Sequence, residues 1–203
     1  MAPILRCLAD DPLPDCWLVA GAVAQTLWNR HFGLPHDHGI RDVDVVYFDP
    51  DDLSAAGEQR QATRVAELLA DLPVAIDVKN EARVHLWYAR RFGLPIPPYP
   101  SMAAAIATFP TTATAIGVRL RRGCFEIEAP FGLDDLLAGI VRANPVLAGE
   151  AVYRAKTDRW AAKWPGLVVV PWRDVTGAAP AGSAPATPPS QARPGGRSAN
   201  SPK

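Results

Sequence analysis

The sequence predicts one α/β domain, with helices packed on a mixed β-sheet and a helical C-terminal portion. Three observations support this prediction. The 203 residues have ordinary apolar content, which suffices for one buried core. Short apolar runs, typical of buried strands, alternate with segments of helical spacing. Beyond residue 176 the chain is rich in Pro, Gly and Ser and has no aliphatic side chain larger than Ala. We therefore expect the domain at residues 1–176 and a disordered tail at 177–203.

The first half of the chain alternates between strand and helix patterns. The apolar run at 17–20 ends at Gly21, and the segment after it has helical spacing until Gly33 and Pro35. Asp49-Pro50 ends a second strand, and Pro73 ends a long helix with a polar face. Helices are expected at residues 3–10, 22–32, 53–71 and 81–92, and strands at 17–20, 42–49 and 74–80.

The second half predicts a hairpin followed by helices. Two alternating segments meet at Arg122-Gly123, which is a turn signal. Arginines on one arm and glutamates on the other favour cross-strand charge pairing. Ser101 is a suitable N-cap for a short helix. The expected elements are helices at 102–108, 133–140 and 149–163, strands at 115–121 and 124–129, and an edge strand at 167–170.

Composition narrows the possible functions. Residues 1–177 carry 18 basic and 21 acidic side chains, which gives a net charge of −3. The domain therefore lacks the net positive charge that is typical of general nucleic-acid-binding proteins. No apolar run reaches ~20 residues, so no membrane span is expected. The N-terminus lacks a signal-peptide layout, and Cys7, Cys16 and Cys124 predict free thiols. We therefore expect a cytoplasmic protein.

Asp42 and Asp44 are unusual because they lie in an apolar strand, where aspartate is disfavoured. Residues i and i+2 of a strand share a face, roughly 6.5–7 Å apart. Asp77 has the same layout in the next strand and offers a third carboxylate. Carboxylates are ligands for Mg²⁺, which also binds substrate phosphates. A metal site for phosphoryl transfer requires the three carboxylates to converge; ordinary strand-end acids are the alternative interpretation.

Gly21-Ala22 lies between the first strand and the following helix. Such a turn can present backbone N–H groups at a helix N-terminus to a phosphate, and glycine permits close approach. The alternative interpretation is that Gly21 is present only for steric reasons at the turn and binds no phosphate. Together with the three aspartates, this turn indicates a metal-dependent enzyme acting on nucleoside triphosphates.

The sequence resembles the DNA polymerase β-like nucleotidyltransferase superfamily, which includes the head domain of CCA-adding enzymes. More specifically, it resembles a small bacterial nucleotidyltransferase family whose substrate is not defined. The resemblance covers roughly residues 5–172. It rests on the segments WLVAGAVAQTLW, DVDVVYFD, IDVKNEARVHLWY, FPTTATAIGVRL and APFGLDDL, and on the helix with Arg154, Lys156 and Trp160.

The resemblance implies a nucleotidyltransferase fold and a set of site residues. Asp42 and Asp44 would bind Mg²⁺ or Mn²⁺, and Asp77 would share a metal and activate the acceptor hydroxyl. Gly21-Ala22 would contact the triphosphate. The sequence departs from the superfamily pattern at Ala22, where Gly or Ser is usual, and in the longer interval between Ala22 and Asp42.

Further candidates surround these residues. Lys79 shares a face with Asp77, and Asn80 follows it, so both are candidates for binding the nucleotide. Lys156 lies on a basic helix that could hold triphosphate or a polynucleotide. Solvated surface positions are the alternative for both lysines. His36 and His38 form an H-x-H pair that could ligate a transition metal. The default interpretation is that both are solvent-exposed loop residues without a metal.

The sequence therefore predicts transfer of a nucleoside monophosphate from an NTP to an unidentified acceptor hydroxyl, with release of pyrophosphate. The acceptor is a small molecule, RNA or protein. One alternative is a nucleotide-binding or protein-interaction module that retains the fold without catalysis. Another is a toxin-like enzyme that nucleotidylates RNA or protein.

Overall fold

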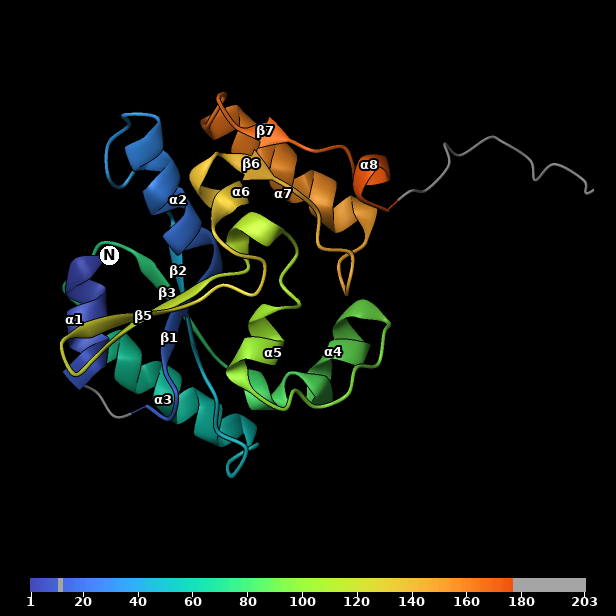
Figure 1. Ribbon diagram of the computed structural model, residues 1–203. Helices are drawn as coiled ribbons and strands as arrows, with labels where there is room; N and C mark the ends of the chain where they lie inside the picture. The colour runs from blue at the N-terminus through green and yellow to red at the C-terminus, as the bar shows by residue number, and fades with distance from the viewer. Residues whose placement is uncertain (11–12, 177–203) are drawn as a thin grey trace, which may run out of the picture.

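A computed structural model of the protein describes residues 1–10 and 13–176 and confirms the expected mixed sheet with packed helices (Figure 1). The main sheet has the strand order β3-β2-β1-β4-β5, in which β2 and β3 are parallel and the other neighbours are antiparallel. Its strands are β1 (Trp17–Val19), β2 (Asp42–Tyr47), β3 (Ala75–Asn80), β4 (Gly117–Arg121) and β5 (Cys124–Glu128). The predicted tail at 177–203 lies outside the described residues.

Helices pack on both faces of the sheet. The α-helices are α1 (Ala2–Asp10), α2 (Ala20–His31), α3 (Ala55–Leu68), α4 (His85–Phe92), α5 (Met102–Ile106), α6 (Asp134–Leu137), α7 (Glu150–Lys163) and α8 (Trp172–Thr176). Two 3-10 helices, η1 (Glu81–Arg83) and η2 (Thr112–Thr114), precede α4 and β4. A second, two-stranded parallel sheet joins β6 (Ile140–Val141) and β7 (Val168–Val169).

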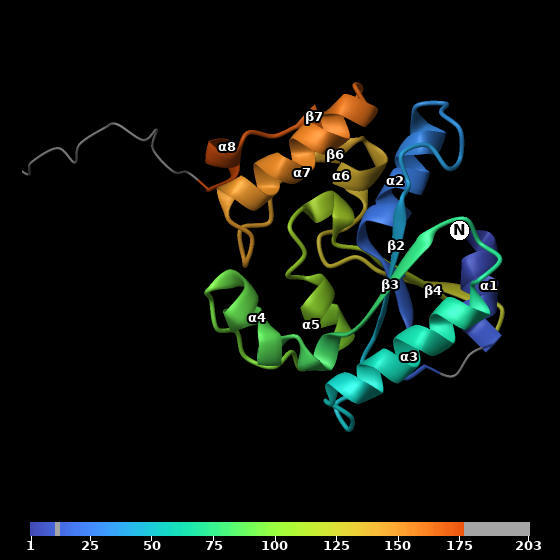
Figure 2. The same cartoon turned by 180° about the vertical axis from the view of Figure 1, so that it is seen from behind.

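Side-chain alternation gives the main sheet two different faces. Leu18, Val43 and Val45 point to one face, where they join a core that includes apolar residues of α1 and α3. Seen from behind, α3 runs alongside β3 (Figure 2). Val19 and Val46 point to the other face and pack with α5. Asp44 pairs with Val19, so we call this second face the carboxylate face.

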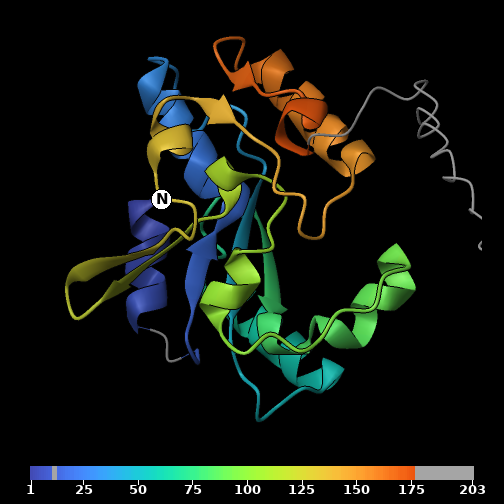
Figure 3. The ribbon, with the colours of Figure 1, turned by 45° about the vertical axis from the view of Figure 1, so that its right-hand side comes forward.

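Helix α7 is fixed above α2 by three tryptophans. Trp160 and Trp164 each pack edge-on against Trp28, with ring centroids 5.5 and 5.6 Å apart. The indole N–H of Trp164 donates to Oδ1 of Asn29 at 2.7 Å. Figure 3 shows α7 and α4 projecting on the same side of the molecule. All three tryptophans are buried in the core.

Three predicted elements differ from the structure. The helix expected at 81–92 is divided into η1 and α4 at Val84. The helix expected at 133–140 is only α6, because the left-handed backbone of Gly139 (φ +67°) ends it before β6. The strand expected at 167–170 pairs with β6 in the second sheet and does not extend the main sheet.

The predicted hairpin turn is confirmed at Arg122-Gly123. Both residues have left-handed backbone, with φ values of 52° and 78°, as a two-residue hairpin turn requires. Arg119 lies opposite Glu126 and donates to its carboxylate at 2.6 Å. Arg121 lies opposite Cys124, so the predicted charge pairing is confirmed for one arginine and not for the second.

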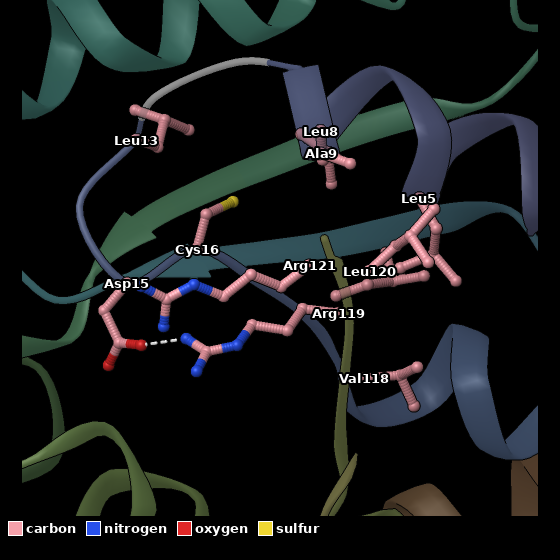
Figure 4. Close-up of a pocket in the computed structure, with 11 residues that line it drawn as sticks. Leu5, Leu8, Ala9, Leu13, Asp15, Cys16, Val118, Arg119, Leu120 and Arg121 are labelled. Atoms are coloured by element: carbon pink, nitrogen blue, oxygen red, sulfur yellow. Dashed lines mark hydrogen bonds and ion pairs between the residues drawn. The ribbon is translucent and has the colours of Figure 1, made fainter. Parts of the chain in front are cut away.

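Arg119 also fastens the hairpin to the start of β1. Its guanidinium stacks over the Trp17 ring at 4.1 Å and forms an ion pair with Asp15 (Figure 4). A cavity between α1 and the hairpin surrounds this pair, and none of the predicted site residues lines it. Within residues 1–10 and 13–176 no cysteine takes part in a disulfide, as expected, and Cys124 is exposed. In the part of the chain that the structure describes, no helix is both long and apolar enough to cross a membrane.

Candidate functional site

The pairing of β2 with β3 places the three aspartates on one face of the sheet. The two strands are parallel, and Asp44 lies directly opposite Asp77 in the register. Asp42 lies two residues before Asp44 on β2, so its side chain points to the same face. The three aspartates therefore share one face of the sheet, which is necessary for the predicted convergence on a metal but does not by itself establish it.

Asp44 is the most perturbed of these carboxyl groups. It is partly buried, and burial raises its pKa from 3.8 to about 6, with further contributions from the negative charges of Asp42 and Asp77. Lys156 and Lys79 oppose the increase without cancelling it. A cation at this position would relieve a repulsion that the two lysines leave uncompensated.

The fit of a divalent metal to this face depends on side-chain rearrangement. Among residues 1–10 and 13–176, no three His, Cys, Asp or Glu side chains are grouped closely enough to hold a metal ion. One reason is that Nζ of Lys79 binds Oδ1 of Asp77 at 2.6 Å. Both side chains are partly exposed, at 38% and 55%, so the ion pair can open by rotation. The donor set itself, carboxylates on one face, suits Mg²⁺ or Mn²⁺.

The start of α2 lies beside Asp44, because β1 leads directly into this helix. The helix begins at Ala20, so Gly21 and Ala22 lie in its first turn and not, as predicted, in a turn before it. Ala20 has a left-handed backbone (φ 57°), an uncommon conformation for alanine that is found at functional sites. No side chain caps the N-terminus. The first N–H groups of a helix have no partner within it, so they can bind an anion.

Gly21 and Ala22 differ in their surroundings. The Ala22 side chain is buried in the core, at 1% exposure. A Cβ at Gly21 would meet only the side-chain amide of Gln25, at 3.1 Å, and the backbone there does not require glycine. A side chain at position 21 would therefore require only a small shift of the Gln25 side chain, and no backbone strain demands glycine there.

Lys156 of α7 faces the carboxylates from above. Burial lowers its pKa, as does the nearby positive charge of Arg159, and the charges of Asp44 and Asp42 oppose this effect. Its Nζ lies 5.8 Å from the centre of the Trp160 ring. The structure thus brings Lys156 and Lys79 together around Asp44, although they come from α7 and β3.

Asn80 has a structural function, which corrects its prediction as a nucleotide-binding residue. Its side chain is fully buried and forms four hydrogen bonds to the backbone. Oδ1 accepts from the N–H groups of Asp49 and Ala82, and Nδ2 donates to the carbonyl groups of Asp49 and Asp52. No hydrogen-bonding capacity remains for a ligand. His38 is also structural, since its Nε2 binds the carbonyl oxygen of Lys163 at 2.9 Å.

The sequence analysis missed Glu81, which immediately follows β3. Its side chain is 8% exposed, and burial raises its pKa to about 7, aided by the charges of Glu58 and Asp44 and opposed by Lys79. Glu81, Lys79 and Lys156 line one cavity of about 500 Å³. No local pattern marks Glu81 as a site residue, because acids are ordinary at the start of a helix.

Comparison with known proteins identifies the family of this fold. A family model described as Nucleotidyltransferase matches residues 6–169, which is most of the chain. The chain belongs to this nucleotidyltransferase family. The match includes the three aspartates, the start of α2 and Lys156. Nucleotidyl transfer is therefore the general reaction of this enzyme, as the resemblance implied.

The first of two similar solved structures agrees with this assignment. The chain is similar to a protein whose NMR structure "reveals a CCA-adding enzyme head domain", with 28% identity, a TM-score of 0.68 and coverage of 84% of this chain and 88% of that one. A tRNA-processing enzyme in an apo form is 16% identical, with a TM-score of 0.48, and the aligned region spans 44% of its length. A search of curated proteins finds no match.

Proposed function

We propose that the protein transfers a nucleoside monophosphate from an NTP to an acceptor hydroxyl and releases pyrophosphate, in a reaction that requires a divalent metal. The observation that carries this proposal is the strand register, which sets Asp44 opposite Asp77 and Asp42 on the same face. In this family such carboxylates face a metal-bound triphosphate. The acceptor oxygen forms a bond to the α-phosphorus while the bond from that phosphorus to the bridging oxygen of pyrophosphate breaks.

Asp42, Asp44 and Asp77 would hold Mg²⁺ or Mn²⁺. When bound, such an ion offsets the charge that develops on the phosphate oxygens. Asp77 would be released by opening its ion pair with Lys79 and would then take the proton of the acceptor hydroxyl. The freed Lys79 ammonium then faces the phosphates.

The start of α2 and Lys156 would bind the triphosphate. The uncapped first turn at Gly21-Ala22 directs backbone N–H groups toward an anion. Lys156 lies on the other side of Asp44, on α7. Positive groups from two elements therefore flank the carboxylates, and catalysis depends mainly on positioning and electrostatics.

The test is Mg²⁺-dependent release of pyrophosphate, measured with each NTP and a cell extract as the source of acceptor. We expect release by the unaltered protein and its loss in Asp42→Asn and Asp77→Asn. Asp71→Asn, at an exposed position in the turn after α3, serves as the matched control and should keep full activity. Activity that survives in both site variants would refute the mechanism.

Two observations favour a second candidate, a nucleotide-binding module without catalysis. Asp77 is paired with Lys79, and Ala22 stands where a hydroxyl-bearing residue is frequent in the superfamily. This candidate predicts NTP binding without pyrophosphate release from any extract. If turnover occurs, label from the α-phosphate distinguishes a small-molecule acceptor from RNA or protein.

A further inference from the structure

A cavity of about 500 Å³ opens beside the carboxylate face, between β3, α4, α7 and the segment that follows α5. Its walls are largely aromatic and aliphatic, and several of its rim side chains remain exposed. Phe92 is 52% exposed, Leu94 45% and Val152 42%. Exposed apolar side chains gathered around a hollow mark a ligand-binding groove. The aromatic residues of the lining are Trp87, Tyr88, Phe92, Tyr99 and Phe109.

The two ends of this cavity differ in chemistry. Lys79 and Lys156 line the end nearest Asp44, and both act electrostatically on that carboxylate. The aromatic rings lie toward α4, where Tyr88 and Phe92 are 4.6 Å apart between ring centroids. A ligand that fills the whole cavity therefore has an anionic end and a planar, stacking end. A nucleoside triphosphate has this distribution.

Glu81 is a buried carboxylate in the same lining. It is 8% exposed, and among the described residues no hydrogen bond or ion pair to its side chain is found. The Glu81 oxygens are not among the fully buried atoms that lack a partner, so they retain access to the cavity that the residue lines. A largely buried carboxylate is stabilised by hydrogen-bond donors, and a ligand in this cavity can supply them. Donors from a ligand favour the ionised form of this carboxyl group, which offers two acceptor oxygens and no donor.

We propose that this cavity binds the nucleobase of the NTP and that Glu81 selects guanine; this rests on the proposed function. Guanine carries two adjacent donors, N1–H and the exocyclic amino group, which match the two oxygens of a carboxylate. Adenine and cytosine place an acceptor nitrogen beside their amino group, and uracil places carbonyl oxygens on both sides of its N–H. Each of these arrangements directs a lone pair at the carboxylate and is repelled.

The experiment measures binding of the four α,β-methylene NTP analogues with Mg²⁺, followed by tryptophan fluorescence and calorimetry. The analogues lack the bond that nucleotidyl transfer breaks, so binding is observed without turnover. We expect the guanine analogue to bind roughly 10- to 100-fold more tightly than the others, as one bidentate contact provides. Glu81→Gln offers one acceptor and one donor, so it should weaken guanine binding and strengthen adenine or cytosine binding.

Two further variants keep the test interpretable. Phe92→Ala removes an exposed ring from the wall and should weaken all four analogues by roughly 5-fold or more, since it removes stacking without changing the base preference. Glu67→Gln, on an exposed position of α3, should bind like the unaltered protein. If Glu81→Gln does not fold, Phe92→Ala still tests whether the base occupies this cavity.

The outcomes separate this proposal from the proposed function. If all four analogues bind equally, or if Glu81→Gln keeps the guanine preference, Glu81 does not select the base. Should Phe92→Ala also bind normally, the cavity does not hold the base and serves another ligand, such as the acceptor. In both cases, pyrophosphate release that is lost in Asp77→Asn would still support nucleotidyl transfer. Failure of every analogue to bind would overturn both proposals.

Discussion

Replacing Asp44 by asparagine should stabilise the protein at neutral pH. Burial and the charges of Asp42 and Asp77 raise the pKa of Asp44 from 3.8 to about 6. The protonated form is thus favoured in the folded state. Stability from this proton is complete below pH 3.8 and is lost as the pH rises through 6. A shift of this size corresponds to about 3 kcal/mol at pH 7.5.

Asparagine has nearly the same shape and carries no charge at any pH. Asp44→Asn should therefore raise the free energy of unfolding at pH 7.5 by up to about 3 kcal/mol, or Tm by roughly 6–12 °C for a domain of this size. The gain should disappear near pH 4. Unfolding followed by tryptophan fluorescence in EDTA, at pH 7.5 and at pH 4, measures both values.

Two controls sharpen this comparison. Asp71→Asn, at an exposed position, should change stability by no more than about 0.5 kcal/mol at either pH. Mg²⁺ should stabilise the unaltered protein more than Asp44→Asn, because an ion that binds only the folded state shifts unfolding by mass action. Equal or lower stability of Asp44→Asn at pH 7.5, with no dependence on pH, would refute the electrostatic reasoning.

Two other substitutions test neighbouring features. Gly21→Ala should change stability by less than about 1 kcal/mol, because the new Cβ meets only the flexible end of Gln25, yet it should weaken NTP binding in calorimetry; unchanged binding would separate Gly21 from the nucleotide. Asn80→Ala should lower the free energy of unfolding by about 2–4 kcal/mol in urea, because it leaves buried backbone groups unpaired; a loss below 1 kcal/mol would contradict its structural function.

Local patterns predicted most of the sheet. Period-two alternation placed Asp42, Asp44 and Asp77 on polar faces of two strands, and the strand register then brought them to one face of the sheet. The hairpin turn at Arg122-Gly123 was predictable because its residues need left-handed backbone. Signals of this kind depend on the residue and its nearest neighbours, so they are readable from the sequence.

The remaining features depend on distant contacts. Lys156 lies some 110 residues after Asp44, and the tryptophan contacts between α7 and α2 decide that the two meet. Asn80 looked available for a ligand because the backbone groups that occupy it come from the loop after β2. Glu81 became notable only through its burial in a cavity formed by four separate elements. No local pattern encodes such contacts.

We infer that the charges on the carboxylate face serve catalysis at a cost to stability. One variant tests it most directly: Asp44→Asn, assayed for Mg²⁺-dependent pyrophosphate release with the acceptor source and NTP that give turnover in the unaltered protein. We predict a protein that is more stable at pH 7.5 and at least ~10²-fold less active. A folded Asp44→Asn variant that retains full activity would contradict the account.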